Sequence, residues 1–239
     1  MNYEFYEAEV FKIEDETPDV KRFHFKIGGE NKFEFKAGQF VMFDIPLETT
    51  IISRSYSIAS APNNDNTFEI CAALKSEGLA TPWLWHHVTI GSKLKCSSPV
   101  GKFLLPETID VDLCFIATGT GIAPLRSMIL DIYHSGRPHK NIYLIFGNRW
   151  EKNILYRAEF EQLQHLHPEF TFIPVLSRET AETWKGALGY VHSIYMQLFS
   201  DNRKAYFYLC GWSAMIKEAR LNLKERGYTK QEIKFEVYD

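Results

Sequence analysis

A change of pattern near residue 107 limits this chain to few architectures. Before that point, short strand-like segments follow one another, separated by turn residues such as Gly28, Gly29 and Pro62. Beyond it, near-continuous apolar segments alternate with segments whose apolar residues recur at helical spacing. A succession of short strands predicts a small antiparallel β-barrel, whereas alternating strands and helices predict a doubly wound parallel sheet. We therefore predict two domains, residues 1–107 and residues 108–239.

The same patterns predict where the individual elements lie. Thr81 is expected to be the N-cap of a helix over residues 80–88, with Pro82 at the first helical position. The expected strands of the first domain are residues 4–11, 20–27, 38–46, 53–60, 67–74 and 92–106. The expected strands of the second are residues 111–119, 141–148, 170–177, 205–211 and 233–239, and its helices are residues 121–136, 155–167, 192–201 and 213–227.

Composition and charge exclude several classes of protein. Hydrophobic residues make up 45% of the chain, charged residues 24%, and the formal net charge is −3. This profile is that of a soluble globular protein, without the basic excess that binding to nucleic acid or an anionic membrane requires. No apolar run reaches the length of a membrane span, and the first residues lack the features of a signal peptide. We therefore expect a cytoplasmic protein.

The cysteines and histidines do not predict a metal site. Cys71, Cys96, Cys114 and Cys210 are far apart, and no two have the C-x-x-C spacing of iron–sulfur or zinc sites. The paired histidines at residues 86–87 and 165–167 have no cysteine or carboxylate companions.

One glycine-rich turn predicts a phosphate site. An apolar strand leads through Thr118 into Gly119, Thr120 and Gly121, and a helical segment follows at once. Glycines allow the backbone to approach a phosphate, and the helix N-terminus directs free N–H groups at it. Pro124 stands where the G-x-G-x-x-G fingerprint has its last glycine, and the next strand ends without an acidic residue. These departures argue against a standard Rossmann dehydrogenase.

Five motifs in order carry a family resemblance over nearly the whole chain. They are RSYS (54–57), GLAT (78–81), GTGIAP (119–124), YLCG (208–211) and FEVY (235–238). The sequence resembles the ferredoxin–NADP reductase superfamily, in the single-flavin form without an iron–sulfur domain. The resemblance implies that the barrel binds flavin and that the α/β domain binds NAD(P).

On the flavin side, the resemblance assigns roles to two of the motifs. Arg54 would hold the flavin phosphate, Tyr56 would lie against the isoalloxazine, and Ser57 would stand beside flavin N5. In a strand Arg54 and Tyr56 project to the same side. Gly78 and Thr81 would form a second flavin-phosphate element. The alternative for residues 54–57 taken alone is a solvated edge strand.

On the nicotinamide side, the resemblance implies three further catalytic residues beside Ser57. Cys210 would face nicotinamide C4, Tyr238 would cover the flavin face that nicotinamide must occupy, and Glu236 would lie near the proton path. Asp239 adds one residue beyond the family's terminal tyrosine, which leaves the placement of Tyr238 open.

The nucleotide contacts would come from two strand ends. Thr118, Gly119, Thr120 and Gly121 would bind its phosphates. Ser177 and Arg178 stand where relatives bind the 2′-phosphate, with Lys185 as a possible second positive charge, which favours NADP(H) over NAD(H).

The sequence therefore predicts a flavin-dependent oxidoreductase that passes electrons between NAD(P)H and a separate one-electron carrier such as ferredoxin or flavodoxin. FAD is expected as the flavin, with FMN as the less favoured choice. The first alternative is an NADH-dependent reductase component of an oxygenase or another multi-component system. The second is a non-catalytic flavin-binding electron-transfer subunit, and the third is a nucleotide-binding module without redox chemistry.

Overall fold

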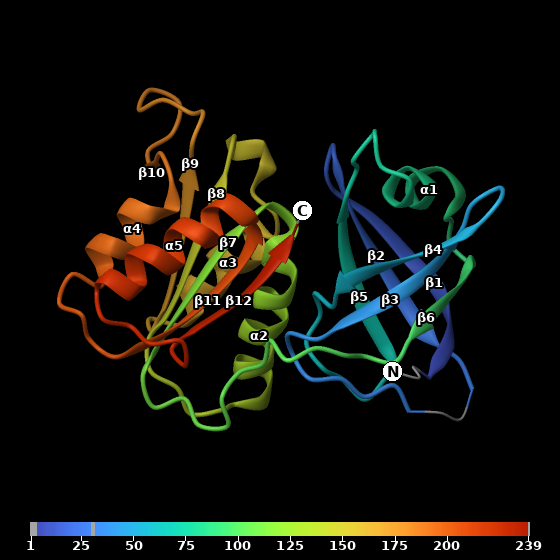
Figure 1. Ribbon diagram of the computed structural model, residues 1–239, viewed down its shortest axis with the longest axis horizontal. Coiled ribbons are helices and arrows are strands. Elements are labelled where there is room, and N and C mark those ends of the chain that lie inside the picture. The colour runs from blue at the N-terminus through green and yellow to red at the C-terminus, as the bar shows by residue number, and fades with distance from the viewer. Residues whose placement is uncertain (1–3, 30–31, 239) are drawn as a thin grey trace. The chain divides into compact units, whose positions relative to one another are not determined.

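The computed structural model describes residues 4–29 and 32–238, and the chain divides into two compact units (Figure 1). The barrel unit comprises Met1–Leu105 together with Arg126–Ser135, and the α/β unit comprises Pro106–Leu125 and Gly136–Asp239. One helix, α2 (Ile122–Ser135), therefore contributes residues to both units. The domain boundary expected between residues 107 and 108 stays a prediction.

The barrel unit is built on one antiparallel sheet of six strands in the order β4-β3-β6-β1-β2-β5. Its two edge strands meet where β4 ends, because Ile58 and Ile70 form an antiparallel bridge and Ala59 N–H donates to Glu69 O at 2.8 Å. The sheet thereby curls into the predicted barrel. The strands are β1 (Phe5–Thr17), β2 (Val20–Ile27), β3 (Phe40–Pro46), β4 (Ile51–Ser57), β5 (Thr67–Ala73) and β6 (Lys93–Ser97).

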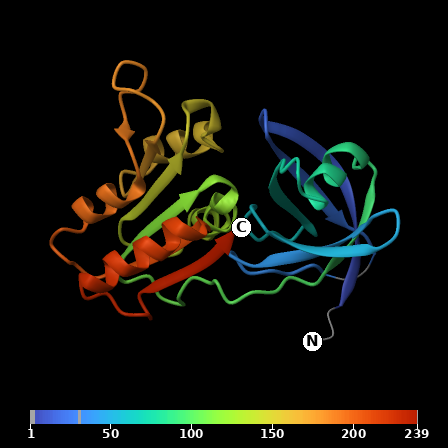
Figure 2. The same ribbon diagram turned by 45° about the horizontal axis from the view of Figure 1, so that its top comes forward.

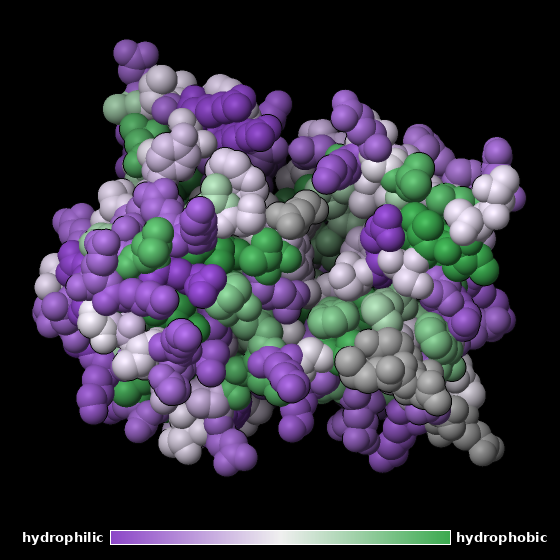
Figure 3. All heavy atoms as spheres, viewed as in Figure 1, coloured by the Kyte–Doolittle hydropathy of each residue, from purple (hydrophilic) through white to green (hydrophobic). Residues whose placement is uncertain are grey.

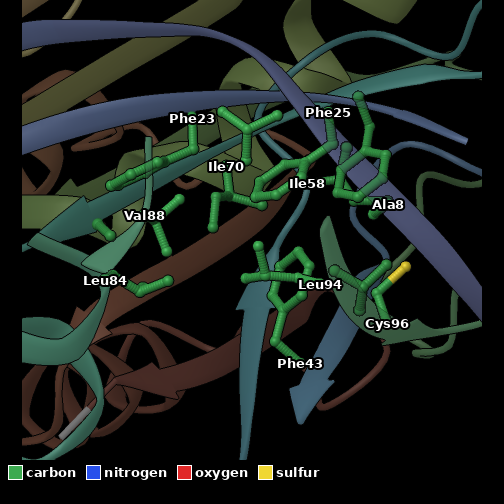
Figure 4. Close-up of a cluster of buried hydrophobic side chains, with 14 of the residues drawn as sticks. Ala8, Phe23, Phe25, Phe43, Ile58, Ile70, Leu84, Val88, Leu94 and Cys96 are labelled. Carbon is green, nitrogen blue, oxygen red and sulfur yellow. The ribbon is translucent and has the colours of Figure 1, made fainter. Parts of the chain in front are cut away.

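Alternating residues of these strands fill the barrel with aromatic and aliphatic side chains (Figure 4). The ring of Phe25 lies 5.1 Å from that of Phe68 and 4.8 Å from that of Phe43, and all three are buried. Leu84, from a short helix over Ala80–His87, also belongs to this cluster. Burying each such side chain stabilises the fold by about 1.5–3 kcal/mol, so the core holds the strands that carry the candidate flavin residues.

The helix α1 (Ala80–His87) of the barrel unit begins at the first residue of the predicted range, one residue before the predicted N-cap, so the predicted cap is wrong. The N-cap position is Leu79, and no side chain caps the helix. The Thr81 hydroxyl lies inside the first turn and accepts a hydrogen bond from Lys75 N–H at 2.9 Å. Pro82 is tolerated after the first helical position because the first N–H groups of a helix have no intrahelical acceptor.

The α/β unit contains a parallel sheet in the order β10-β9-β8-β7-β11-β12 (Figures 1 and 2). Its central strand β7 is buried along nearly its whole length, as expected for a parallel strand covered on both faces. The strands are β7 (Asp112–Thr118), β8 (Ile142–Asn148), β9 (Phe170–Leu176), β10 (Ala187–Leu188), β11 (Ala205–Trp212) and β12 (Ile233–Tyr238). The short strand β10 is not foreseen by the sequence pattern.

Helices cover both faces of this sheet, which confirms the doubly wound architecture. On one face, α4 (Val191–Leu198) and α5 (Ser213–Glu225) pack on side chains of β7, β8 and β11. On the other, α3 (Arg157–Leu166) places Phe160 5.2 Å from Phe172, ring to ring. A 3₁₀ turn, η1 (Gly119–Gly121), joins β7 to α2 (Ile122–Ser135), and a second, η2 (Glu151–Asn153), precedes α3.

The described residues contain neither a cluster of potential metal ligands nor a membrane-spanning helix. Among residues 4–29 and 32–238, no three His, Cys, Asp or Glu side chains are grouped as metal ligands would be. No helix within the same ranges has the length and apolar character needed to cross a membrane.

Candidate functional site

Strand β4 lies at an edge of the barrel sheet and carries the RSYS motif. Its register with β3 pairs Arg54 with Phe43 and Tyr56 with Val41, so both side chains stand on the sheet face of these two buried residues. Ser57 points to the other face and is only 5% exposed. The strand therefore has an exposed half, which ends in a buried serine.

The Arg54 guanidinium is available to an anion. It is exposed, its Nη1 donates only to the neighbouring Ser53 O at 2.9 Å, and it forms no ion pair with any residue the structure describes. The nearby carboxylate of Asp44 accepts a hydrogen bond from Ser53 Oγ at 2.6 Å and pairs with Lys95 at 3.0 Å. Arg54 can therefore bind a phosphate with two donors without giving up an ion pair.

Tyr56 combines a packed ring with a phenol that stays protonated. Its ring is half-buried and lies 6.0 Å from the ring of Phe43. Burial raises the pKa of the phenol from 10.0 to about 12, and the positive charge of Arg54 opposes this rise. A neutral aromatic side chain at an exposed edge is suited to stacking on a planar ring.

The GLAT segment forms a tight turn before α1. Gly78 N–H donates to Lys75 O at 2.8 Å, and a Cβ atom on Gly78 would lie 3.1 Å from the same oxygen. The Thr81 hydroxyl is bonded to the backbone of Lys75, so it serves the turn rather than standing free. Backbone N–H groups at the start of α1 are the donors that this segment can offer to a ligand.

In the α/β unit, the glycine turn and the Cys-Gly motif interlock. A Cβ atom on Gly121 would lie 2.5 Å from Cys210 O, and one on Gly211 would lie 2.3 Å from Thr118 Oγ1. Gly211 also has a φ of +129°, a conformation that L side chains rarely adopt. Two separate motifs of the sequence are thus brought into backbone contact, and only glycine fits at both positions.

Cys210 is a buried, protonated thiol next to two residues of β12. The parallel register pairs Cys210 with Glu236 and Trp212 with Tyr238. Burial raises the pKa of the Cys210 thiol well above its ordinary value, and the Glu236 carboxylate raises it further. Hydrogen bonds from Gly211 N–H and the Tyr238 hydroxyl lower it in part. The thiol is therefore neutral, with no thiolate available for covalent chemistry.

Strand β12 alternates between two environments. Glu236 and Tyr238 are half-buried on the side of Cys210, whereas Phe235 and Val237 are 41% and 43% exposed. Figure 3 shows green hydrophobic surface in the region of β12, among purple hydrophilic side chains. Asp239, which the sequence places beyond the terminal tyrosine, lies outside the described residues.

The carboxyl ends of β8 and β9 bring two arginines together. Ser177 N–H donates to Asn148 O and Arg178 N–H donates to Arg149 O, each at 3.0 Å. Arg149 and Arg178 are exposed, and neither forms an ion pair with a residue of the described ranges. Our sequence interpretation named Ser177 and Arg178 but missed Arg149. Its position at a parallel strand end was the available signal, because such ends meet at one sheet edge.

An open pocket of about 520 Å³ is formed by residues that come soon after these two arginines in the chain. Its lining residues are Trp150, Glu151, Lys152, Arg157 and Glu179. Arg157 is already neutralised there by Glu151 and Glu161, and it lies 5.4 Å from the ring of Trp184. Lys152, which is exposed and forms no ion pair within the described ranges, is therefore the uncompensated cation of the lining, and Arg149 and Arg178 adjoin lining residues in the chain.

The structure groups the predicted residues into two sets, each within its own unit. Arg54, Tyr56, Ser57, Gly78 and Thr81 belong to the barrel unit. The α/β unit holds the rest, namely Thr118, Gly119, Thr120, Gly121, Ser177, Arg178, Cys210, Glu236 and Tyr238.

Comparison with known proteins agrees with this division. Residues 7–104 match the family described as Oxidoreductase FAD-binding domain, and residues 115–221 match the Oxidoreductase NAD-binding domain. The chain is 30% identical to Ferredoxin–NADP reductase B of Sorangium cellulosum, over 98% of each protein. It is 32% identical to Phenol hydroxylase P5 protein of Acinetobacter pittii, over 98% of this chain but only 65% of that protein's length.

A solved structure shows the same fold. A ferredoxin NADP+ reductase from Neisseria gonorrhoeae, determined with bound FAD and NADP, superposes with a TM-score of 0.83 at 24% identity. The match covers 99% of each chain. With both halves matched and a full-length relative at 30% identity, the chain belongs to the ferredoxin–NADP reductase family and is an FAD- and NAD(P)-dependent oxidoreductase.

Proposed function

We propose that this reductase takes electrons from NADPH in preference to NADH and passes them singly to a separate carrier protein of the ferredoxin or flavodoxin type. The observation that carries the choice of nucleotide is the pair of exposed arginines, Arg149 and Arg178, joined through their backbones at 3.0 Å. The similarity to Ferredoxin–NADP reductase B over the full length of both chains supports the type of carrier.

The residues of the barrel unit fit a flavin. We assign Arg54 to the flavin phosphate, because its guanidinium has no ion pair within the described ranges, and Tyr56 to the ring. Ser57 supplies a small donor for flavin N5. Since the Thr81 hydroxyl is bonded to Lys75, the second phosphate contact falls to backbone N–H groups after Gly78. When bound, FAD supplies the redox chemistry, which converts a two-electron donor into single-electron transfers.

The residues of the α/β unit fit a nicotinamide dinucleotide. The turn over Gly119–Gly121 offers N–H groups at the start of α2, where a diphosphate is stabilised. The neutral thiol of Cys210 positions the nicotinamide without reacting, because burial, and after it the Glu236 carboxylate, raises the pKa of that thiol. The Tyr238 ring occupies the place that nicotinamide needs and must move aside, so it lowers nucleotide affinity.

The 2′-phosphate distinguishes the two nicotinamide donors. A dianionic phosphate gains charge-assisted hydrogen bonds from two guanidinium groups, whereas the 2′-hydroxyl of NADH gains little. The hydroxyl of Ser177 can add a neutral donor beside them. The Lys185 ammonium, which the sequence suggested as a further charge, donates to Ala181 O at 2.8 Å within its own loop.

A second candidate function is that of a reductase component of an oxygenase. Two relatives favour it, Phenol hydroxylase P5 protein at 32% identity and a phenol 2-monooxygenase reductase component from a Pseudomonas strain at 31%. The chain spans 65% of the length of each. The two functions share every residue named above and differ in the protein that accepts the electrons.

Anaerobic stopped-flow spectroscopy tests both proposals. The purified protein is mixed with NADPH or NADH, and the loss of flavin absorbance is followed. Ferredoxin, flavodoxin or an oxygenase component is then added to the reduced protein. Faster bleaching by NADPH and rapid reoxidation by ferredoxin or flavodoxin support the proposal. Reoxidation by the oxygenase component alone favours the second function, and a bound flavin that neither nucleotide reduces identifies a non-catalytic subunit.

A further inference from the structure

Two successive residues of α2 hold two successive carbonyl groups of the barrel unit. Arg126 Nη1 donates to Ala59 O at 2.9 Å, and Ser127 Oγ donates to Ser60 O at 2.6 Å. Both side chains belong to the part of α2 that groups with the barrel, and both residues are buried. A buried guanidinium and hydroxyl are thus directed at main-chain oxygens beyond the end of strand β4.

The segment they hold, residues 58–60, follows directly after Ser57. Its remaining hydrogen bonds come from other elements: Ile58 N–H donates to Gln39 O at 3.0 Å, and Ala59 N–H donates to Glu69 O at 2.8 Å. Glu69 N–H in turn donates to Ser60 Oγ at 3.1 Å. Because the hydrogen-bonded pairing of β4 with β3 ends at Ser57, the backbone position of residues 58–60 depends on these contacts.

Arg126 has a second partner, which complicates a simple substitution. Its Nη1 lies 3.3 Å from the carboxylate of Glu69, whose side chain is 5% exposed. Arg22 and His24 also approach that carboxylate, at 4.0 Å and 3.9 Å. Removing the guanidinium alone leaves a buried carboxylate undercompensated, which is destabilising in itself. An experiment must therefore distinguish the ion pair of Arg126 with Glu69 from its hydrogen bond to Ala59 O.

We infer that Arg126 and Ser127 are positioning residues that hold residues 58–60 and thereby fix the Ser57 hydroxyl in the direction that flavin N5 requires. The inference rests on the proposed function for the identity of the atom that Ser57 faces. The hold itself depends only on contacts within the barrel unit. Both side chains bind main-chain carbonyl groups, so both act through the backbone that follows Ser57.

The variants Ser127→Ala and Glu69→Gln/Arg126→Met test the inference, and the single variant Arg126→Met is measured beside them. The first removes one hydrogen bond without altering charge, and the second removes both charges of the buried pair together with the hold on Ala59. Ser135→Ala is the matched control, because Ser135 lies on the same helix but its hydroxyl donates to Asp131 O, at 2.6 Å, within that helix. Urea unfolding confirms that each variant is folded.

Two measurements are made on each folded variant. Hydrogen–deuterium exchange of the apoprotein follows the amides of Ile58 and Ala59, and stopped-flow mixing of the FAD-loaded protein separates the flavin reduction rate from NADPH affinity. We expect about fivefold faster exchange and about fivefold slower reduction at saturating NADPH in both test variants. NADPH affinity should be unchanged, and Ser135→Ala should match the parent protein in every measurement.

The outcomes separate the inference from the proposed function. Unchanged exchange in both test variants, or faster exchange with an unchanged reduction rate, overturns the inference and leaves the function standing. Normal behaviour of Glu69→Gln/Arg126→Met, with a defect only in Arg126→Met, shows that Arg126 serves charge pairing alone and also overturns it. If the parent protein binds no flavin, the proposed function fails, and faster exchange in the two test variants still supports the hold on residues 58–60.

Discussion

The side-chain oxygen of Thr118 accepts a hydrogen bond from Trp212 N–H at 2.9 Å, across 94 positions of sequence. This bond closes the contact between the glycine turn after β7 and the Cys-Gly motif at the end of β11. A Cβ atom on Gly211 would lie 2.3 Å from the same threonine oxygen. The nucleotide turn and the thiol proposed to position nicotinamide are therefore one packed structure.

Gly211→Ala should consequently destabilise the protein. The new methyl group meets Thr118 and also faces a φ of +129°, so we expect a loss of about 2–4 kcal/mol in the free energy of unfolding. Gly227→Ala is the control, since its φ is +93° but nothing lies within 4 Å of the added Cβ. Urea unfolding measures both. Equal losses in the two variants would show that backbone strain alone accounts for the effect.

Arg149→Ala and Arg178→Ala should each lower kcat/KM for NADPH by about 10–100-fold, because each removes charge-assisted hydrogen bonds to the 2′-phosphate. The value for NADH should change less than about twofold, since its ribose carries no phosphate. Lys224→Ala removes an exposed positive charge of α5 and serves as the control. Steady-state kinetics with both donors checks this. Similar losses with NADPH and NADH would contradict a 2′-phosphate role.

Tyr238→Ser should tighten the binding of NADP+ by about 2–10-fold, because nicotinamide no longer competes with a stacked aromatic ring. Phe235→Ser is the matched control: it removes an aromatic ring from the same strand, but from the exposed side, where Arg220 lies 3.9 Å from the ring. Equilibrium titration followed by difference spectroscopy measures both affinities. An unchanged affinity in Tyr238→Ser would eliminate the gating role.

The buried phenol of Tyr56 should make stability depend on pH above neutrality. Its pKa is raised from 10.0 to about 12, so folding favours the protonated form. The resulting stabilisation is fully present below pH 10 and is lost as pH rises through 10 towards 12. Tyr56→Phe should therefore show a shallower fall of the urea midpoint between pH 9.5 and about 11.5. Parallel curves for the two proteins would contradict this assignment.

Local pattern was sufficient to predict most of the architecture. The apolar alternation of residues 20–27 matches β2 at both ends, and the near-continuous apolar run into Thr118 is the buried central strand β7. These elements were predictable because the spacing of apolar residues along the sequence indicates both the type of element and its buried face. The five motifs likewise identified the family, which the full-length relative at 30% identity confirms.

The predicted helix cap was wrong because a backbone group outside the helix decided the outcome. The sequence suggests Thr81 as an N-cap. In the structure its hydroxyl accepts a hydrogen bond from Lys75 N–H, and the helix begins at Ala80. Helix capping depends on which acceptor or donor the folded chain places nearby, and sequence alone does not state that.

The sequence by itself determined two domains, the order of strands and helices along the chain, and the residue types suited to a flavin and a nicotinamide nucleotide. Tertiary structure alone decided that Arg149 stands beside Arg178, that Gly121 and Gly211 face Cys210 and Thr118, and that Arg126 holds Ala59. The physical reason is range: periodicity acts between neighbours in sequence, whereas these contacts join groups that only the sheet register and helix packing bring together.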